Sequence, residues 1–290
     1  MVPSGLREFT QELLGRKYGS ALKIERVLPT GGGSINRTVQ LQTTEGSFFL
    51  KFNDAQLYPR MFELEKRGLE VLRQANEILI PEVIECGEAG EFAFLLLEYI
   101  DSGIQRREFW EDFGLSLARL HKCSSTTYGL DHDNYIGSLE QSNAPYKSWS
   151  EFFVAERLAP QVRMAQLSSE IVGMFTKLYE KVDALFPEEQ PALLHGDLWS
   201  GNYMTSADGE AVLIDPAVYY GHREMDIGMT KLFGGFSEGF YAAYNSAYPM
   251  EAGWETRVDI CNLYPLMVHV NLFGGSYLSQ VTSILRKYTG

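Results

Sequence analysis

The hydrophobic pattern of this chain changes its period once, shortly after residue 100, and this change limits the folds open to the chain. Before that point, short runs alternate as strands do and are separated by glycine-rich turns. From Gln105 onward, helical periodicity dominates, apart from short strands predicted around residues 192–215. The strand-like runs before the change, with the glycine-rich turns that some of them include, cover residues 23–33, 36–44, 47–54, 81–88 and 92–100, with a helix over residues 56–75 and a short amphipathic helix at the N-terminus.

This pattern predicts an α+β fold with two lobes. Residues 1–101 are expected to form a five-stranded antiparallel sheet with one main helix, and residues 102–290 a larger, mostly helical lobe. A chain of 290 residues is long enough for both. The segment LFGG occurs at residues 232–235 and again at 272–275 with different flanks. We therefore interpret both copies as sites of close helix packing rather than as a repeat.

Charge and composition exclude several classes of function. The net charge is −13, which disfavours a nucleic-acid partner because phosphate binding needs a basic face. The three cysteines, Cys86, Cys123 and Cys261, have neither metal-ligand nor disulfide spacing. No apolar run approaches the length of a membrane span, and the N-terminus lacks the apolar core of a signal peptide. We therefore expect a cytoplasmic monomer with no nucleic-acid or membrane partner.

Three consecutive glycines stand between two predicted strands, in the segment PTGGGSIN. Gly31, Gly32 and Gly33, followed by Ser34, permit backbone conformations closed to other residues and let amide groups approach a phosphate. The segment matches neither the P-loop pattern nor a strict G-x-G-x-x-G. By itself it is also compatible with a flexible hairpin turn, and both interpretations stay open.

Lys51 lies inside the apolar strand pattern FFLKF. It either reaches outward to solvent or faces inward, where an unpaired ammonium is costly and needs an anionic partner. In the predicted helix, Glu63 belongs to a face on which the other residues are charged, so solvent exposure explains it. Glu65 instead shares a face with Met61 and Leu69. We therefore favour a pair between Lys51 and Glu65, with Glu63 as the alternative.

The stretch ALLHGDLWSGNYM, residues 192–204, is an apolar strand that ends in polar residues punctuated by glycine. Asp197 and Asn202 are related as D-x-x-x-x-N, the spacing of a phosphotransferase catalytic loop. Asp215 ends a second apolar strand, thirteen residues after Asn202. Two carboxylates and an amide oxygen at strand ends can bind Mg²⁺, which accepts oxygen ligands and substrate phosphates. Together with the lysine and glutamate upstream, these residues predict phosphoryl transfer.

With these motifs in place, the chain resembles the protein-kinase-like fold, and within it the small-molecule kinases marked by HGD, such as aminoglycoside phosphotransferases and choline kinases. The resemblance is sharpest to the fructosamine-3-kinase (ketosamine-3-kinase) family and covers essentially the whole chain. It is carried by LLHGDLWSGN (193–202), IDPAVYYGHREMDIGMTKLFGGF (214–236), YGLDHDNYIGSLEQSN (128–143) and PTGGGSINRTVQLQTTEGSFFLKFN (29–53).

The resemblance implies a role for each candidate residue. Asp197 would orient the substrate hydroxyl and accept its proton, while Asn202 and Asp215 would bind Mg²⁺. Lys51, positioned by Glu65, would hold the α- and β-phosphates of ATP. The other residues expected to bind ATP are Gly31, Gly32, Gly33 and Ser34 in the glycine-rich segment and Glu98, Tyr99 and Ile100 in the hinge that meets adenine.

Further residues follow from the same resemblance. Trp199 and His222 are expected to bind the sugar substrate; the alternative for Trp199, a loop aromatic that acts as a packing anchor, is the less favoured one. Asp226 would tie down the catalytic loop, and His195 would orient it by hydrogen bonds.

The activity that the resemblance implies is an ATP- and Mg²⁺-dependent phosphorylation of the 3-hydroxyl of a ketosamine, either a small molecule or linked to a protein. By family analogy the 3-phosphate is unstable and the amine is regenerated, so the role would be deglycation. The first alternative is another small-molecule kinase of the aminoglycoside phosphotransferase or choline kinase type, families that do not share the stretch 128–143. The second is a nucleotide-binding regulator without turnover.

Overall fold

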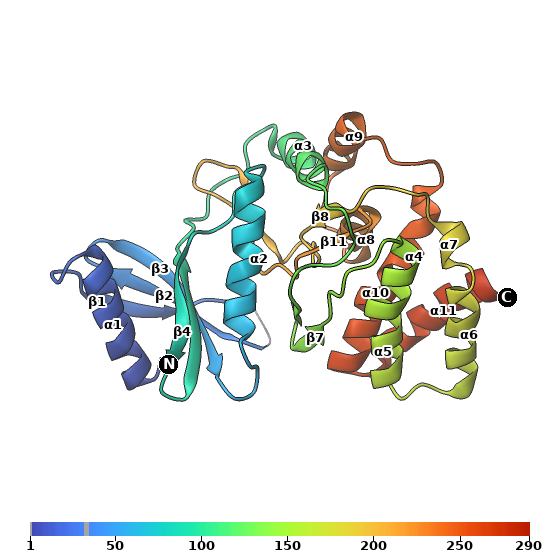
Figure 1. Cartoon of the computed structure of the whole chain (residues 1–290). Coiled ribbons are helices and arrows are strands. Elements are labelled where there is room, and N and C mark those ends of the chain that lie inside the picture. Colours follow the sequence, from blue (N-terminus) through green and yellow to red (C-terminus); the bar gives the residue numbers. More distant parts are fainter. Residues whose placement is uncertain (1, 32–34) are drawn as a thin grey trace.

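The computed structural model describes residues 2–31 and 35–290 of the chain. The predictions for Gly32, Gly33 and Ser34 lie outside the described residues. A sheet-rich part and a larger, mostly helical part lie side by side (Figure 1), which confirms the predicted α+β fold.

The N-terminal part is built on a five-stranded antiparallel sheet of order β1-β2-β3-β5-β4. Helices α1 (Ser4–Tyr18) and α2 (Met61–Ala75) cover its two faces (Figure 1). On β5, Phe94 and Leu96 pack with side chains of α1, whereas Leu95 packs with those of α2. The predicted strands and the N-terminal helix are therefore confirmed. The strands are β1 (Ile24–Pro29), β2 (Arg37–Thr43), β3 (Gly46–Asp54), β4 (Val83–Ala89) and β5 (Phe92–Glu98).

The same alternation decides where Lys51 points. On β3, Phe48, Leu50 and Phe52 pack on the α1 side of the sheet. Successive side chains of a strand point to opposite faces, so Lys51 faces α2. The lysine is therefore buried between the sheet and this helix.

The C-terminal part is a set of packed helices. Helix α3 (Phe109–His121) packs against α9 (Glu238–Ala247), and α10 (Trp254–Phe273) packs against both α8 (Glu224–Leu232) and α11 (Leu278–Thr289). Within residues 2–31 and 35–290, no helix combines the length and apolarity needed to cross a bilayer. The remaining helices are α4 (Trp149–Phe152), a π-helix (Phe153–Leu158), α5 (Ala159–Met164), α6 (Ser169–Tyr179), α7 (Val182–Leu185) and a 3₁₀ helix (Gly275–Tyr277).

Short strands interrupt the helices and carry the polar motifs. Strand β8 (Ala192–Leu194) pairs with β11 (Tyr219–Gly221), and the two strands run antiparallel to each other. Strand β8 and the pair near residues 203–213 lie in the region where short strands were predicted, whereas β11 and the hairpin in the 134–141 region were not predicted. Each has three residues, too few for a period of two to stand out in the sequence. The two other pairs are β9 (Tyr203–Thr205) with β10 (Ala211–Leu213), and β6 (Asn134–Ile136) with β7 (Leu139–Gln141).

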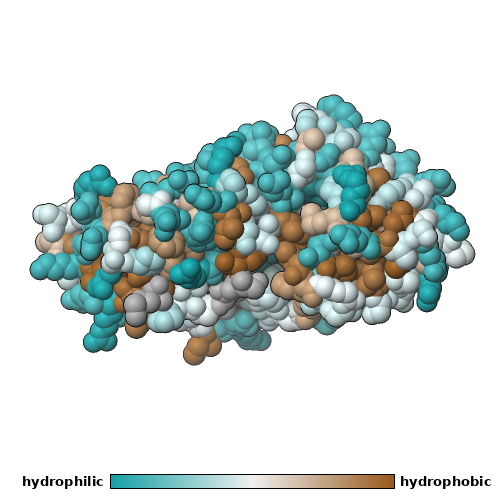
Figure 2. Space-filling view, turned by 90° about the horizontal axis from the view of Figure 1, so that it is seen from below, coloured by the Kyte–Doolittle hydropathy of each residue, from teal (hydrophilic) through white to brown (hydrophobic). Residues whose placement is uncertain are grey.

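One hydrophobic cluster joins the two parts of the molecule. It contains Leu69 and Leu72 of α2, Leu95 of β5, Leu117 of α3 and Leu213 of β10. Seen from below, hydrophobic side chains also gather on both sides of the junction between the two parts (Figure 2). Helix α2 therefore packs on the sheet and on the helical part at once, which brings its polar residues close to the motifs beyond β8.

Candidate active site

The loop that follows β8 carries the predicted catalytic aspartate. Asn202 donates from Nδ2 to the backbone oxygen and to Oδ2 of Asp197, both at 2.9 Å. The backbone N–H groups of His195 and Gly196 donate to the two carboxylate oxygens of Asp226, on α8, at 2.8 and 2.9 Å. One helix residue thus anchors the start of the loop, as the resemblance implied.

Only glycine fits immediately before the predicted catalytic aspartate. Gly196 has φ +83°, and a Cβ there would lie 2.0 Å from the carbonyl oxygen of Ala217. In addition, Nε2 of His195 lies 2.9 Å from the carbonyl oxygen of Ile214. The catalytic loop therefore touches the segment around Asp215 at two points, which explains the histidine and the glycine of the HGD motif.

The environment of Asp197 favours its protonated form. Burial raises the pKa of Asp197 to about 7, and the charges of Asp215 and Asp226 act in the same direction, whereas the hydrogen bond from Asn202 opposes them. A carboxylate with a pKa near neutrality is suited to accept a proton from an alcohol.

Lys51 bridges two carboxylates that come from distant parts of the chain. Its Nζ lies 2.7 Å from Oε1 of Glu65 on α2 and 2.8 Å from Oδ1 of Asp215. Glu63, the alternative partner in the sequence, instead pairs with Arg60 at the protein surface. Burial by itself would lower the pKa of Lys51, but the charges of Asp215 and Glu65 outweigh it and raise that pKa. The ammonium therefore stays charged beside Asp215, a contact that the sequence did not predict.

Asp215 and Asn202 offer a donor set that suits Mg²⁺. Asp215 follows β10 with φ +54°, an uncommon conformation outside glycine, and its side chain is 43% exposed. The N–H of Ile214 donates to the backbone oxygen of Asn202 at 3.0 Å, which holds the two candidate ligands together. No group of three His, Cys, Asp or Glu in the described part of the chain could hold a metal. Two protein oxygens, completed by phosphates and water, are nevertheless the coordination that Mg²⁺ accepts.

Of the remaining residues predicted to bind ATP, those that the structure describes lie at or just beyond the ends of two strands of the sheet. Glu98 ends β5, its backbone N–H donates to the carbonyl of Glu82 at 2.9 Å, and Tyr99 and Ile100 follow half-buried. Gly31 is exposed just after β1. Glu98 therefore lies at the end of the strand next to β3, which carries Lys51, whereas Gly31 follows β1, which β2 separates from β3.

Trp199 lies at the surface of the catalytic loop and touches further aromatic rings. It is 36% exposed, and its ring meets that of Phe233 edge-on, with centroids 5.9 Å apart. Phe233 in turn lies 5.2 Å from His269 on α10, and His269 lies 5.4 Å from Phe273. We call Trp199, Phe233, His269 and Phe273 the aromatic cluster. Of these four, sequence reasoning singled out only Trp199.

A signal for the aromatic cluster was present in the sequence but was misinterpreted. The two LFGG segments contribute Phe233 and Phe273. Close helix packing was the wrong interpretation, because the glycines lie where helices end: Gly234 has φ +70° and Gly274 φ +90°. Both phenylalanines stay exposed at these helix ends, at either side of His269.

His222, which was expected to bind substrate, lies elsewhere. Its side chain is 0% exposed and packs on Trp149 and Phe186, with centroid distances of 5.8 and 5.1 Å. Burial lowers the pKa of His222 to about 4, although the charge of Glu189 opposes this shift. The prediction is therefore corrected: a fully enclosed imidazole has no surface to offer a sugar.

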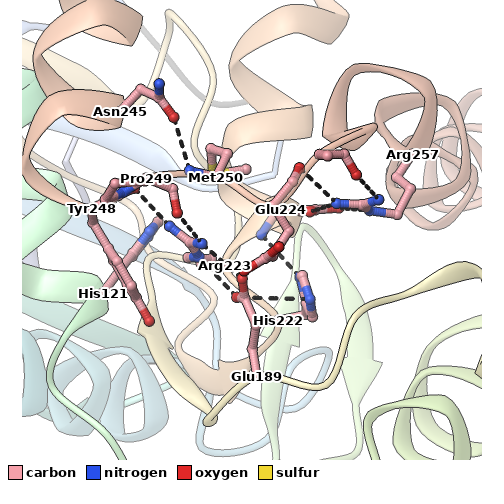
Figure 3. A network of polar contacts seen from close by, with 12 residues as sticks. His121, Glu189, His222, Arg223, Glu224, Asn245, Tyr248, Pro249, Met250 and Arg257 are labelled. Carbon is pink, nitrogen blue, oxygen red and sulfur yellow. Dashed lines mark hydrogen bonds and ion pairs between the residues drawn. The ribbon is translucent and has the colours of Figure 1, made fainter.

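Ion pairs surround His222 and fasten α8 to its neighbours (Figure 3). Arg223 donates two hydrogen bonds to Glu189, at 2.8 and 2.7 Å. Glu224 accepts two from Arg257 of α10, at 2.7 and 2.5 Å. The segment HRE of the sequence is thus a structural brace at the start of the helix that carries Asp226.

Comparison with known proteins identifies similar sequences and folds. Residues 7–289 match the sequence model of a family described as fructosamine kinase. The chloroplastic protein-ribulosamine 3-kinase of Arabidopsis thaliana is 39% identical over 278 residues, which covers 93% of this chain and 84% of that protein. A crystal structure from Thermobifida fusca, of a protein provisionally named fructosamine-3-kinase, has a TM-score of 0.87 at 31% identity and covers 98% of both chains.

A more distant structure shares the fold alone. The aminoglycoside phosphotransferase APH(4)-Ia, in a ternary complex with AMP-PNP and hygromycin B, has a TM-score of 0.63 at 14% identity, over 97% of this chain and 99% of that one. The protein-kinase-like fold expected from the sequence is therefore confirmed.

Proposed function

The chain belongs to the fructosamine kinase family, and from this premise we propose that it transfers the γ-phosphoryl group of ATP to the 3-hydroxyl of a ketosamine. The arrangement of Lys51, Asp197, Asn202 and Asp215, which an ion pair and hydrogen bonds hold together, is the observation that carries the proposal. The name of the Arabidopsis relative, a protein-ribulosamine 3-kinase, supports the choice of a ketosamine as acceptor. Binding of AMP-PNP by the structural neighbour supports ATP as the donor.

Phosphoryl transfer requires positioning and charge stabilisation more than covalent chemistry. In the proposed mechanism Lys51, kept charged by two carboxylates, holds the α- and β-phosphates. Asp215 and Asn202 would hold Mg²⁺, which would supply positive charge to the phosphates of the nucleotide. Asp197 orients the acceptor hydroxyl and takes its proton, and Asn202 fixes the aspartate by donating to Oδ2.

The two lobes predicted from the sequence divide these tasks. We assign residues 1–101 to nucleotide binding, with Gly31, which is exposed after β1, as a candidate contact to the phosphates. Glu98, Tyr99 and Ile100 would meet adenine through backbone groups. Residues 102–290 supply the aspartates and the acceptor site.

The aromatic cluster is the best candidate for the acceptor site. Trp199 stands two residues after Asp197 and remains 36% exposed, so its ring can stack on a sugar face next to the proposed base. Phe233 extends the aromatic surface away from the loop. We place the amine carrier, either a small molecule or a protein side chain, along this exposed surface.

The test is an ADP-release assay on a panel of acceptors, with product identification by mass spectrometry. The panel contains synthetic fructosamines and ribulosamines, an aminoglycoside and choline. We expect Mg²⁺-dependent ADP release with ketosamines only, and loss of turnover in Asp197→Ala with nucleotide binding retained. Turnover with choline or the aminoglycoside alone would contradict the ketosamine assignment, and nucleotide binding without any turnover would identify a regulator.

A further inference from the structure

A set of buried polar side chains lies next to the segment that follows Asp215 and takes no part in the proposed mechanism. They come from the stretch 128–143 and from the helix that follows it. Gln141 is 2% exposed, and Asn143 and Arg157 are 0% exposed. Burying amides and a guanidinium is costly unless each finds partners, so this set needs an explanation.

The amides of the β6–β7 hairpin are directed at the segment that follows Asp215. Gln141 donates from Nε2 to the carbonyl oxygen of Ala217 at 3.2 Å and to Oδ1 of Asn134 at 2.8 Å. Asn134 donates from Nδ2 to the carbonyl oxygen of Val218 at 2.7 Å. Two adjacent backbone carbonyls are therefore held by side chains of the hairpin rather than by a strand partner.

Further hydrogen bonds fix the side-chain amides of Gln141 and Asn134 in place. The hydroxyl of Tyr264, on α10, donates to Oε1 of Gln141 at 2.6 Å. Asn143 donates to Oδ1 of Asn134 at 3.1 Å and accepts from Arg157 at 2.6 Å. The guanidinium of Arg157 lies 4.0 Å over the ring of Tyr219 and has no carboxylate partner within residues 2–31 and 35–290. The amides therefore have fixed positions and fixed orientations.

The two carbonyls belong to the junction between the proposed metal ligand and the catalytic loop. Ala217 follows Asp215 by two residues, and its N–H donates to the carbonyl of His195 at 2.9 Å. Its carbonyl is the atom that leaves room only for glycine at Gly196. Asp215 itself has φ +54°, which a residue with a side chain keeps only where its surroundings hold it.

We propose that Gln141 and Asn134 are positioning residues, which set the place of the Asp215 carboxylate relative to Asp197 through the carbonyls of Ala217 and Val218. The inference rests on the proposed function, because it assigns the β6–β7 hairpin to the metal side of the same site. It explains why Asn134 and Gln141 of the stretch 128–143 are buried: the hairpin is the frame of the segment that carries the proposed metal ligand.

A matched pair of variants separates positioning from general stability. Gln141→Met keeps the side-chain volume but removes both donated hydrogen bonds and the bond from Tyr264. Tyr264→Phe removes only the bond from the tyrosine and leaves the contacts of Gln141 with Ala217 and Asn134 in place. The comparison therefore isolates the two donated bonds.

The measurement is binding of a fluorescent ATP analogue to the full chain during a Mg²⁺ titration, together with the melting temperature. We expect Gln141→Met to raise the Mg²⁺ concentration for half-maximal binding by about tenfold, in the range for residues behind metal ligands. Tyr264→Phe should change it by less than about twofold. Binding of the analogue without Mg²⁺ should be the same in both variants and in the wild type.

Several outcomes would overturn the inference. If Gln141→Met lowers the melting temperature but keeps the Mg²⁺ dependence of the wild type, the hydrogen bonds of Gln141 only stabilise the protein core. If that variant does not fold, Asn134→Ser is measured in the same way, and an unchanged Mg²⁺ dependence there overturns the proposal. A wild-type chain that binds no nucleotide at all would instead refute the proposed function and the inference with it, so the two failures are distinguishable.

Discussion

Glu65→Gln, which removes the charged partner of Lys51 on α2, should lower kcat/KM only by disturbing the position of the Lys51 ammonium. Lys51 Nζ lies 2.7 Å from Glu65 and 2.8 Å from Asp215, and the side chains of Lys51 and Glu65 are 4% and 12% exposed. Glu65→Gln keeps the shape of the side chain and removes its charge, while Asp215 still holds the ammonium. The lysine should therefore shift towards Asp215 rather than become unpaired.

The expected magnitudes follow from this burial. Loss of a charge-stabilising donor in an enclosed site commonly lowers the rate by about 100- to 1000-fold, which we expect for Lys51→Met. Glu65→Gln should cost less, about 10- to 100-fold in kcat/KM, because one carboxylate remains. The double variant should be about as active as Lys51→Met alone, which corresponds to a coupling energy of about 1–3 kcal/mol.

The assay is a double-mutant cycle on kcat/KM for ATP, measured by ADP release with a saturating ketosamine. Glu63→Gln is the matched control, since it makes the same chemical change two residues away on the same helix, in an exposed pair with Arg60. It should change kcat/KM by less than about twofold. Full additivity of Lys51→Met and Glu65→Gln, or an equal loss in Glu63→Gln, would refute the role of the buried pair.

Three further outcomes are expected. Asp215→Asn should weaken nucleotide binding in the presence of Mg²⁺ and leave the binding without Mg²⁺ intact; an unchanged Mg²⁺ dependence would count against Asp215 as a ligand. Trp199→Ala should raise KM for the ketosamine by about 5- to 150-fold and leave KM for ATP nearly unchanged, whereas equal damage to both constants with a lower melting temperature would make the tryptophan a packing anchor. Burial lowers the pKa of His222 from 6.5 to about 4. As the pH falls from 6.5 to 4, this histidine is therefore protonated in the unfolded chain but remains neutral in the folded chain. The free energy of unfolding should thereby drop by about 3 kcal/mol between those pH values, and His222→Gln should flatten this part of the denaturant-measured pH profile; an identical profile would contradict an uncharged buried imidazole.

The fold and the lysine–glutamate pair could be predicted because both depend on short-range periodicity. A period of two on β3 places Lys51 on the face opposite Phe48, Leu50 and Phe52. A period of 3.6 on α2 places Glu65 with the buried Leu69 and not with the exposed Glu63. Both rules act within one element, so the partner across the interface follows once the sheet and the helix are known to pack.

Other features depend on contacts between residues far apart in the sequence, which the periodicity of a single element does not predict. The contact between Lys51 and Asp215 spans 164 residues, and it forms only because α2 packs on both parts of the molecule. His222 lies just past the end of β11, where strand alternation no longer applies. Its enclosure is decided by Trp149 and Phe186, from two separate helical segments, and a motif match could not distinguish this enclosed position from a place in the substrate site.

The stretch 128–143 illustrates a distinctive motif whose task the sequence leaves open. In the sequence it serves only to separate the ketosamine kinase family from other small-molecule kinases. In the structure Gln141 and Asn134 are buried and donate to the backbone beside Asp215. The proposed acceptor surface is made of different residues, the exposed and mutually touching rings of Trp199 and Phe233. In this proposal the frame and the acceptor surface are separate sets of residues, so substitution in the aromatic cluster should change the acceptor while the segment around Asp215 keeps its geometry.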